Sequence, residues 1–367
     1  MKNINVILCA AMLLGVLSGC GNKHQFTING TVDGTEMNGK TFYLFDLYSE
    51  SNTPLDSTVV TDGKYTFKGT VDEPKNVIVD AADAPFTVRI ILEPGTIVIN
   101  NDSIGGTPLN DKLQAYNVSH NVDEIRAAME EFLPLYYEAP NAAARAAAEH
   151  VLDSLDALGT SLLLDADWKL YNENKDNILG LIAMEEIVQM GTFTYNELDS
   201  IAKSASPNVA NSKPMQKKLA MLQAIDATSA GKHYTDIQGL DGKLSDLIDG
   251  KLALVDFFAS WCGPCKNEIK DNLVPLWKKY EKKGLVIVGM NVWERGNAEE
   301  RKAAHEKVMA DLGITYPQLV DSTRTATDTY GVQYIPQIIL IDKDGTILAR
   351  DLRGPAIEEA IVNALGK

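Results

Sequence analysis

A pair of cysteines two residues apart limits the folds open to this chain more than any other segment. The sequence Trp-Cys-Gly-Pro-Cys, Trp261–Cys265, follows the apolar run Leu252–Phe258 and precedes residues with helical spacing, which predicts a strand, a tight turn and a helix. A helix start presents free N–H groups and the positive end of the macrodipole, and both favour a thiolate over a thiol. We therefore expect the pKa of Cys262 to lie below the value of about 8.5 of a free cysteine. Cys265 follows about one turn later, close enough to form a disulfide.

Other uses of a Cys-x-x-Cys pair fit this sequence less well. A zinc site needs four ligands, and the nearest histidines, His233 and His305, stand alone. Covalent haem attachment requires His directly after the second cysteine, where this chain has Lys266. A purely structural disulfide would close a very short loop and so would constrain the unfolded chain little. The sequence therefore predicts a redox-active dithiol, with no metal and no cofactor.

The first residues, 1–20, have the features of a signal peptide for export. Lys2 supplies the positive start, and the apolar stretch Ile4–Leu17 is too short to span a bilayer comfortably. The sequence Leu-Ser-Gly-Cys that ends at Cys20 resembles a bacterial lipobox, and this resemblance implies cleavage before Cys20 and lipid attachment to its sulfur. The alternative is an ordinary secretory signal with a chance cysteine.

Lipid chains on Cys20 would tether the mature protein to a membrane without a spanning helix. We expect a lipid-anchored protein of the cell envelope that faces the periplasm. The residues after Cys20 lack the Asp that favours inner-membrane retention in some bacteria, which favours the outer membrane over the inner one.

Export leaves Cys262 and Cys265 as the free thiols of the mature chain, so any disulfide exchanged with them comes from another protein. The expected partners are a protein disulfide substrate and a membrane or periplasmic thiol electron donor. A formal net charge of -16, without a basic stripe, argues against nucleic acid as a partner.

At 367 residues the chain exceeds the size at which one core keeps growing, so several domains are expected. Residues 21–105 contain short runs rich in β-branched and aromatic residues, with a turn signal at Asp62-Gly63, and predict a small antiparallel β-sandwich. Residues 106–230 change to helical spacing and predict a helical spacer domain. Residues 231–367 alternate strand and helix, as in an α/β domain.

This last part closely resembles the thioredoxin superfamily. Val255–Cys265 is similar to its active-site strand and loop, and Tyr334-Ile335-Pro336 is similar to its cis-proline loop. The predicted extra helix at 297–312 resembles the insertion of the TlpA/ResA-like branch of exported, membrane-tethered thiol oxidoreductases. We identify residues 231–367 as a thioredoxin-like domain on this resemblance. The β-rich domain resembles, more weakly, an N-terminal module of such lipoproteins.

The two cysteines receive different roles. Cys262, at the helix start, is predicted to attack a substrate disulfide, and Cys265 to resolve the mixed disulfide that results. Asp256 lies on the predicted buried strand, where an unpaired carboxylate is costly, so we expect a raised pKa and a proton-transfer role toward Cys265. Glu268 matches a glutamate common in the TlpA/ResA branch, and which of the two acids takes the proton stays open.

The resemblance also implies a substrate-binding surface. Its members are the residues that flank the two sulfurs in the active-site turn and in the proline loop: Trp261, Gly263, Pro264, Ile335 and Pro336. Gly-Pro between the cysteines is similar to reducing thioredoxins, so we expect a reductant of protein disulfides. The alternatives are a thiol peroxidase, or a binding lipoprotein that uses the thioredoxin fold as a scaffold.

Overall fold

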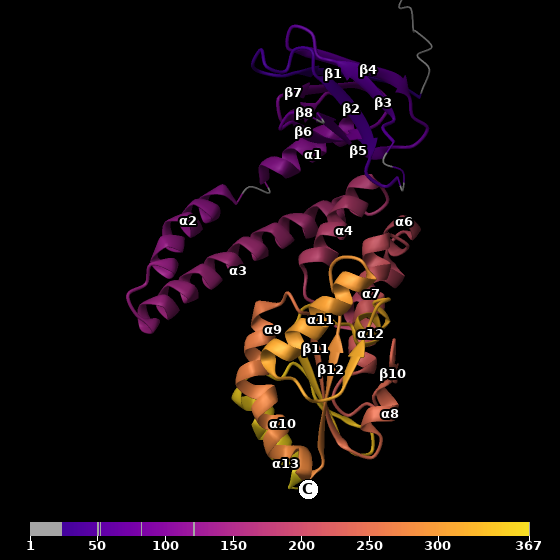
Figure 1. The fold of residues 1–367 in the computed structure, drawn as a ribbon. Coiled ribbons are helices and arrows are strands. Elements are labelled where there is room, and N and C mark those ends of the chain that lie inside the picture. The colour runs from indigo at the N-terminus through magenta and orange to yellow at the C-terminus, as the bar shows by residue number, and fades with distance from the viewer. Residues whose placement is uncertain (1–23, 50, 52, 82, 120–121, 367) are drawn as a thin grey trace, which may run out of the picture. The chain divides into compact units, whose positions relative to one another are not determined.

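The computed structural model describes residues 24–49, 51, 53–81, 83–119 and 122–366 (Figure 1). The predicted signal peptide and Cys20 therefore lie outside the described residues. The chain divides into two compact units, residues 1–184 (unit 1) and 185–367 (unit 2). The predicted boundaries after residues 105 and 230 stay predictions. Within the described ranges, no helix combines the length and the hydrophobicity needed to cross a bilayer.

Unit 1 begins with two four-stranded sheets (Figure 1). One has the order β4-β1-β7-β8, with the bounds Lys64–Thr70, Gln25–Thr31, Gly95–Asn100 and Ser103–Gly105. The other has the order β3-β2-β5-β6, with the bounds Asp56–Val59, Thr41–Asp46, Lys75–Ala81 and Thr87–Leu92. The rings of Phe42 and Tyr65, one from each sheet, lie 4.8 Å apart between centroids, so the apolar faces of the sheets pack together. The predicted β-sandwich is confirmed.

The strand pairing differs from the prediction in two places. The sandwich was expected to be antiparallel, but β1 and β7 run parallel. Parallel neighbours need a long crossover, and here β4 and the four strands of the second sheet lie between β1 and β7 in the chain. Asp62 and Gly63 both have positive φ and form the predicted tight turn, with two backbone hydrogen bonds between Thr61 and Lys64. However, the strands on either side of this turn belong to different sheets, so the turn joins the two layers.

The middle of the chain is helical, as predicted. Its helices in unit 1 are α1 (Pro108–Ser119), α2 (Asp123–Tyr137) and α3 (Ala142–Glu173), and α4 (Ile178–Met190) crosses the division between the units. The side chain of Asn141 caps α3 by accepting a hydrogen bond from the Ala144 N–H group. Unit 2 continues with α5 (Tyr195–Ser204), α6 (Pro207–Ala210) and α7 (Lys213–Ala227).

The five-stranded sheet of unit 2 has the order β13-β12-β11-β14-β15. Its bounds in that order are Gln318–Val320, Leu285–Asn291, Leu252–Phe258, Gln337–Ile341 and Ile347–Ala349. β11 pairs parallel with β12 and antiparallel with β14, and every residue of β11 and β12 is buried. Because both faces of these strands are buried, their sequences are mostly apolar throughout and do not alternate between apolar and polar residues.

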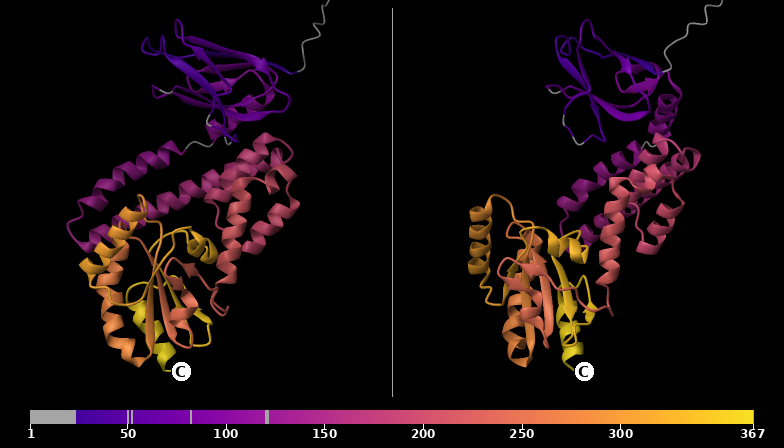
Figure 2. Two further views of the ribbon diagram at one scale, coloured as in Figure 1. Left: turned by 45° about the vertical axis from the view of Figure 1, so that its right-hand side comes forward. Right: turned by 90° about the vertical axis from the view of Figure 1, so that its right-hand side faces the viewer.

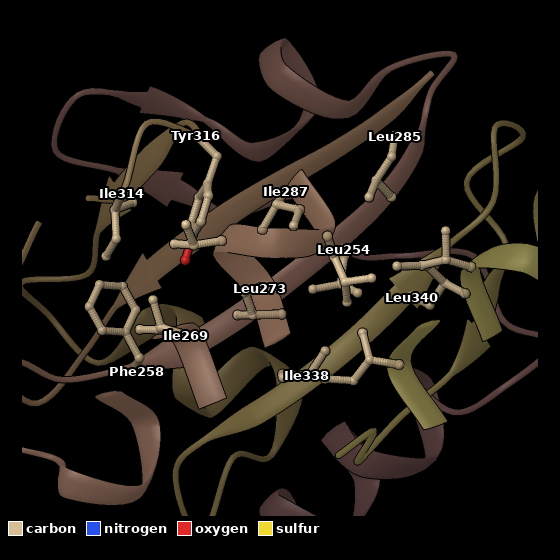
Figure 3. Close-up of a cluster of buried hydrophobic side chains, with 14 of the residues drawn as sticks. Leu254, Phe258, Ile269, Leu273, Leu285, Ile287, Ile314, Tyr316, Ile338 and Leu340 are labelled. Atoms are coloured by element: carbon tan, nitrogen blue, oxygen red, sulfur yellow. The ribbon is translucent and has the colours of Figure 1, made fainter. Parts of the chain in front are cut away.

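Helices cover both faces of this sheet (Figure 2). One face packs against α9 (Gly263–Glu268), α10 (Val274–Tyr280), α11 (Ala298–Leu312) and α13 (Pro355–Leu365), and we call the resulting buried group, which contains both cysteines, the cysteine-side cluster. In Figure 3 its side chains from β11, β12 and β14 meet those of the helix that follows the cysteines. The other face packs against α8 (Leu244–Ile248), which follows the short β9-β10 pair (Gln238–Gly239 and Gly242–Lys243), and against α12 (Thr325–Tyr330). This arrangement confirms the predicted thioredoxin-like α/β fold.

The helix after the cysteines contains an irregularity that the prediction missed. Residues Ile269–Leu273 form a π-helical segment between α9 and α10, and the Val274 N–H group donates to the Ile269 carbonyl. Pro275 follows and has no N–H group to continue a regular ladder, which accounts for the wider turn at this point.

Candidate active site

The two cysteines lie where β11 has ended and α9 begins, and they form a disulfide. Cys262 is the N-cap of α9, and its Sγ accepts a hydrogen bond from the Cys265 N–H group over 3.2 Å. The same donor would stabilise a thiolate on Cys262 in the reduced protein. Cys262 is 4% exposed and Cys265 is fully buried. Cys262 is therefore the more accessible of the two sulfurs, and the order of attack stays a prediction.

The predicted proline loop faces this pair. The Ile335–Pro336 peptide bond is cis, as the family resemblance implies, and the Ile335 carbonyl oxygen lies 3.8 Å from Cys262 Sγ. Trp261, Gly263 and Pro264 are exposed around the sulfurs. The structure thus brings together the two loops that the sequence nominated for substrate binding, and their roles remain predictions.

Asp256 lies inside the sheet beneath the disulfide. Leu254 and Phe258, two residues away on either side, belong to the cysteine-side cluster, so the alternation of a strand places Asp256 on the same face as Cys265. The side chain is fully buried, and neither carboxyl oxygen has a hydrogen-bond partner among the described residues. Burial, and after it the charge of Glu268, raise the pKa of Asp256 to about 8, and the charge of Arg353 acts in the opposite direction.

Glu268 occupies the last position of α9 and is held there by hydrogen bonds. Its Oε1 accepts from the Gly354 N–H group over 3.0 Å and from Asn272 Nδ2 over 2.7 Å. The charge of Glu268 contributes to the raised pKa of Asp256, but the two carboxyl groups have different surroundings. The Asp256 oxygens are buried and unengaged, whereas Glu268 is half-buried and accepts two hydrogen bonds.

A glutamate that the sequence reasoning missed holds the active-site turn. Glu294 accepts hydrogen bonds from the N–H group and the hydroxyl of Ser260, both over 2.6 Å, and from Asn291 Nδ2 over 2.7 Å. Ser260 precedes Cys262 by two residues, so Glu294 fixes the approach to the attacking sulfur. Its position shortly after β12 could have indicated this role. β11 and β12 are parallel neighbours, so the residues that follow them lie at the same edge of the sheet.

Two arginines also support the site and were not predicted. The guanidinium of Arg295 stacks on the Trp261 ring, 4.4 Å from its centroid, while Trp261 Nε1 donates to the Trp293 carbonyl over 2.9 Å. The guanidinium of Arg353 donates to the carbonyl of Pro336 and so anchors the proline loop. Within the described part of the chain, no group of His, Cys, Asp and Glu side chains is arranged to hold a metal ion.

Two protein families match different parts of the chain. Residues 223–350 match the AhpC/TSA family, and residues 26–113 match a domain of unknown function, DUF4369. The chain is similar to the thiol-disulfide oxidoreductase ResA of Geobacillus kaustophilus, with 32% identity over 126 residues that cover 34% of this chain and 67% of that protein. It is also 32% identical to ResA of Bacillus thuringiensis over 31% of this chain. The chain spans only 61% of the length of this second relative.

Among solved structures, the chain resembles the thioredoxin domain of a thiol-disulfide oxidoreductase from Bacteroides vulgatus. The identity is 28%, the TM-score is 0.32, and the match covers 37% of this chain and 96% of that one.

Proposed function

Because this chain belongs to the thioredoxin-like thiol-disulfide oxidoreductases of the ResA type, we propose that it reduces disulfides of other proteins through Cys262 and Cys265. The observation that carries this proposal is the bonded cysteine pair at the start of α9, with its outer sulfur beside the proline loop. A purely structural disulfide would not need its more accessible sulfur beside the proline loop.

The reaction needs two exchanges of thiol and disulfide. The Cys262 thiolate attacks one sulfur of the substrate disulfide, a mixed disulfide forms, and the other substrate sulfur leaves as a thiolate. The Cys265 thiol then loses its proton and attacks Cys262 Sγ, which breaks the mixed disulfide and releases the second substrate thiolate. Two electrons pass to the substrate, and the Cys262–Cys265 disulfide remains. A thiol electron donor must then reduce this disulfide to reset the protein.

Asp256 is the better placed of the two acids to take the proton from Cys265. Its side chain lies on the face of β11 that packs against the cysteine-side cluster, to which Cys265 belongs. Neither of its oxygens has a hydrogen-bond partner among the described residues. A carboxyl with a pKa of about 8 is also matched to a thiol, because proton transfer is most efficient between groups of similar pKa. Glu268 then acts mainly through its charge on Asp256.

The test is a trapping experiment on the full chain. With Cys265→Ala, the mixed disulfide on Cys262 has no resolving thiol, so substrate proteins should accumulate as covalent adducts that dithiothreitol releases. Cys262→Ala should trap no substrate and should not reduce insulin disulfides. Equal trapping by both variants would contradict the assigned order. Rapid turnover of hydrogen peroxide without a disulfide substrate would favour the peroxidase, and inactivity of the wild-type chain in both assays would favour the scaffold.

We also propose that the chain is an exported lipoprotein that works on the periplasmic side of the cell envelope, with the outer membrane favoured. The lipobox-like sequence that ends at Cys20 supports this proposal. In cells fed labelled palmitate, the wild-type protein should carry label and sediment with membranes. Cys20→Ala should lose the label and should no longer sediment, whereas Cys9→Ala should behave like the wild type. Labelling that persists in Cys20→Ala would contradict lipidation at this residue.

A further inference from the structure

The Tyr316 hydroxyl and the Asp256 carboxyl share an unusual property. Both are buried, and in the part of the chain that the structure describes neither has a hydrogen-bond partner. Buried polar groups are almost always paired, because burial removes the water that would otherwise bind them. A phenol donates a hydrogen bond and a carboxylate accepts several, so each group could supply what the other lacks within the described ranges.

The strand register places both groups on the same side of the sheet. Asp256 on β11 lies opposite Gly289 on β12, and Gly289 lies opposite Gln318 on β13. Tyr316 precedes Gln318 by two residues and belongs to the cysteine-side cluster, so its side chain is on the face that also carries Asp256. Its ring packs edge-on against Trp277, with 6.2 Å between centroids, and Figure 3 shows its hydroxyl pointing into the cluster. The donor and the acceptor therefore face the same buried interior.

A second donor on this side of the carboxyl is already engaged. The Gln318 amide lies where a side chain of Gly289 would be, because a Cβ atom there would be 2.3 Å from Oε1 and 2.5 Å from Nε2. Its Nε2 donates to the carbonyls of Tyr316 and Pro317 over 3.2 Å and 3.1 Å, and its Oε1 lies 3.3 Å from His305 Nε2. The Tyr316 hydroxyl can thus turn to the buried carboxylate without giving up a hydrogen bond, whereas the amide cannot.

Two charged side chains act on Asp256 from other elements. After the larger effect of burial, Glu268 at the end of α9 raises the pKa of Asp256, and Arg353 beyond β15 lowers it. The Arg353 guanidinium donates to the carbonyls of Pro336 and Leu352. Its charge therefore acts on the carboxylate without the direct hydrogen bond that a buried charge needs.

We propose that Tyr316 is a positioning residue for the resolving step. Its hydroxyl donates, directly or through one water, to the Asp256 carboxylate that accepts the Cys265 proton. A carboxylate must be charged before it can take a proton, and a hydrogen bond favours the charged form. The proton then passes from the Cys265 thiol to Asp256, and the new thiolate attacks Cys262 Sγ. This inference rests on the proposed role of Asp256 and adds the residue that supports it.

Tyr316 keeps its own proton in this step. Burial, and after it the charge of Asp256, raise the pKa of the Tyr316 hydroxyl above its ordinary value. The hydroxyl is therefore a hydrogen-bond donor at every pH at which the two cysteines exchange disulfides, and it does not compete with Asp256 as an acid.

The test follows the two exchanges separately in the reduced full chain, with an aromatic disulfide whose thiolate absorbs visible light. The first release of thiolate reports attack by Cys262, and the second reports resolution by Cys265. In wild type the rate of the second release should rise with pH, with a midpoint of about 8 set by Asp256. Tyr316→Phe should move this midpoint up by about one pH unit, because the charged form loses a hydrogen bond, and should leave the first release unchanged.

The matched control is Tyr330→Phe, which removes the hydroxyl of a fully buried tyrosine on the opposite face of the same sheet. That hydroxyl donates to the Thr235 carbonyl over 2.7 Å, so the control also loses a hydrogen bond but should keep the midpoint. An unchanged midpoint in Tyr316→Phe, or an equal shift in the control, would overturn the inference. If wild type shows neither release, the proposed function itself is contradicted.

An infrared titration tests the hydrogen bond without turnover. In the oxidised full chain, the protonated-carboxyl band that Asp256→Asn removes should disappear with a midpoint of about pH 8 in wild type. The midpoint should lie about one pH unit higher in Tyr316→Phe, and Tyr330→Phe should match wild type. Equal midpoints in all three proteins would overturn the inference whatever the kinetic result. If the titration shifts but Asp256→Asn keeps the wild-type profile of the second release, the hydrogen bond stands and the proposed proton-transfer role of Asp256 is wrong.

Discussion

At the scale of single residues, the buried carboxyl of Asp256 is the most unusual feature of the molecule. Neither of its oxygens has a hydrogen-bond partner among the described residues, and the pKa of the group is raised to about 8, chiefly by burial. A buried group of this kind lowers stability whenever it is charged. The proposed proton exchange with Cys265 would give this costly group a function.

This raised pKa makes the stability of the fold depend on pH. In the unfolded chain Asp256 titrates near about 3.9, so between about pH 4 and pH 8 the folded state holds a proton that the unfolded state has lost. The free energy of unfolding should therefore fall as the pH rises through this window, by at most about 4 kcal/mol between pH 5 and pH 8, at 1.36 kcal/mol for each pKa unit.

Asp256→Asn should remove that fall, because an amide of the same shape does not titrate in this range. Urea unfolding of the oxidised full chain at pH 5 and pH 8 measures the difference between variant and wild type. Asp226→Asn, at an exposed position of α7, is the control and should lose stability with pH as wild type does. If Asp256→Asn lost stability with pH as steeply as wild type does, the raised pKa would not belong to Asp256.

At the scale of secondary structure elements, two glycines test how tightly helices pack in unit 2. Gly313 ends α11 and Gly331 ends α12, and both have positive φ, at 65° and 59°. A Cβ atom at position 313 would meet nothing within 4 Å, whereas at position 331 it would lie 2.5 Å from Ile225 Cγ1 and 2.7 Å from the Met221 carbonyl oxygen. α12 thus approaches the backbone of α7 as closely as a glycine allows.

We predict unequal effects of the same substitution at these two positions. Gly313→Ala should cost about 1 kcal/mol, because the only penalty is the left-handed backbone. Gly331→Ala should cost about 2 to 4 kcal/mol, because overpacking adds to that penalty. Denaturant unfolding of both variants measures the difference. Equal losses would show that α7 moves away from α12 at little cost.

The elements around the cysteines could be predicted because their signals are local. The expected strand 252–258 coincides with β11, and the expected helix 297–312 is α11 together with its N-cap Asn297. Both could be predicted because a continuous apolar run and a capped helix depend on neighbouring residues. By contrast, β13 and α12 were not predicted, because both are short. Tertiary pairing with β12 makes a strand of only Gln318–Val320, and no periodicity can build up over so few residues.

The supporting residues of the site depend on pairing across the sheet, which sequence spacing does not give. Arg353 reaches the Pro336 carbonyl because β14 and β15 fold back on each other, with Leu340 opposite Ala349. Continued toward the proline loop, this register brings Arg353 opposite Pro336. Sequence spacing does not give the register of these two strands, so the role of Arg353 was invisible until the strands were paired.

At the scale of the whole molecule, the division between the two compact units falls at residue 184, within the helical middle of the chain, and the separate helical domain of residues 106–230 stays a prediction. Helical spacing shows where helices form, but the unit with which each helix packs depends on contacts between distant residues. The redox site lies entirely within residues 252–353 of unit 2.

Two units with separate cores should unfold separately, and reduction of the disulfide should change the stability of only one of them. Calorimetry of the full chain should show two transitions. Ile97→Ala in β7 should lower the midpoint temperature of one transition, and Ile287→Ala in β12 should lower that of the other. Each variant truncates a fully buried side chain, which costs about 2 to 5 kcal/mol. Reduction of the Cys262–Cys265 disulfide should shift only the transition that Ile287→Ala lowers. A single transition moved alike by both variants would show that the units unfold as one, and the redox state of the cysteines would then reach the sandwich as well.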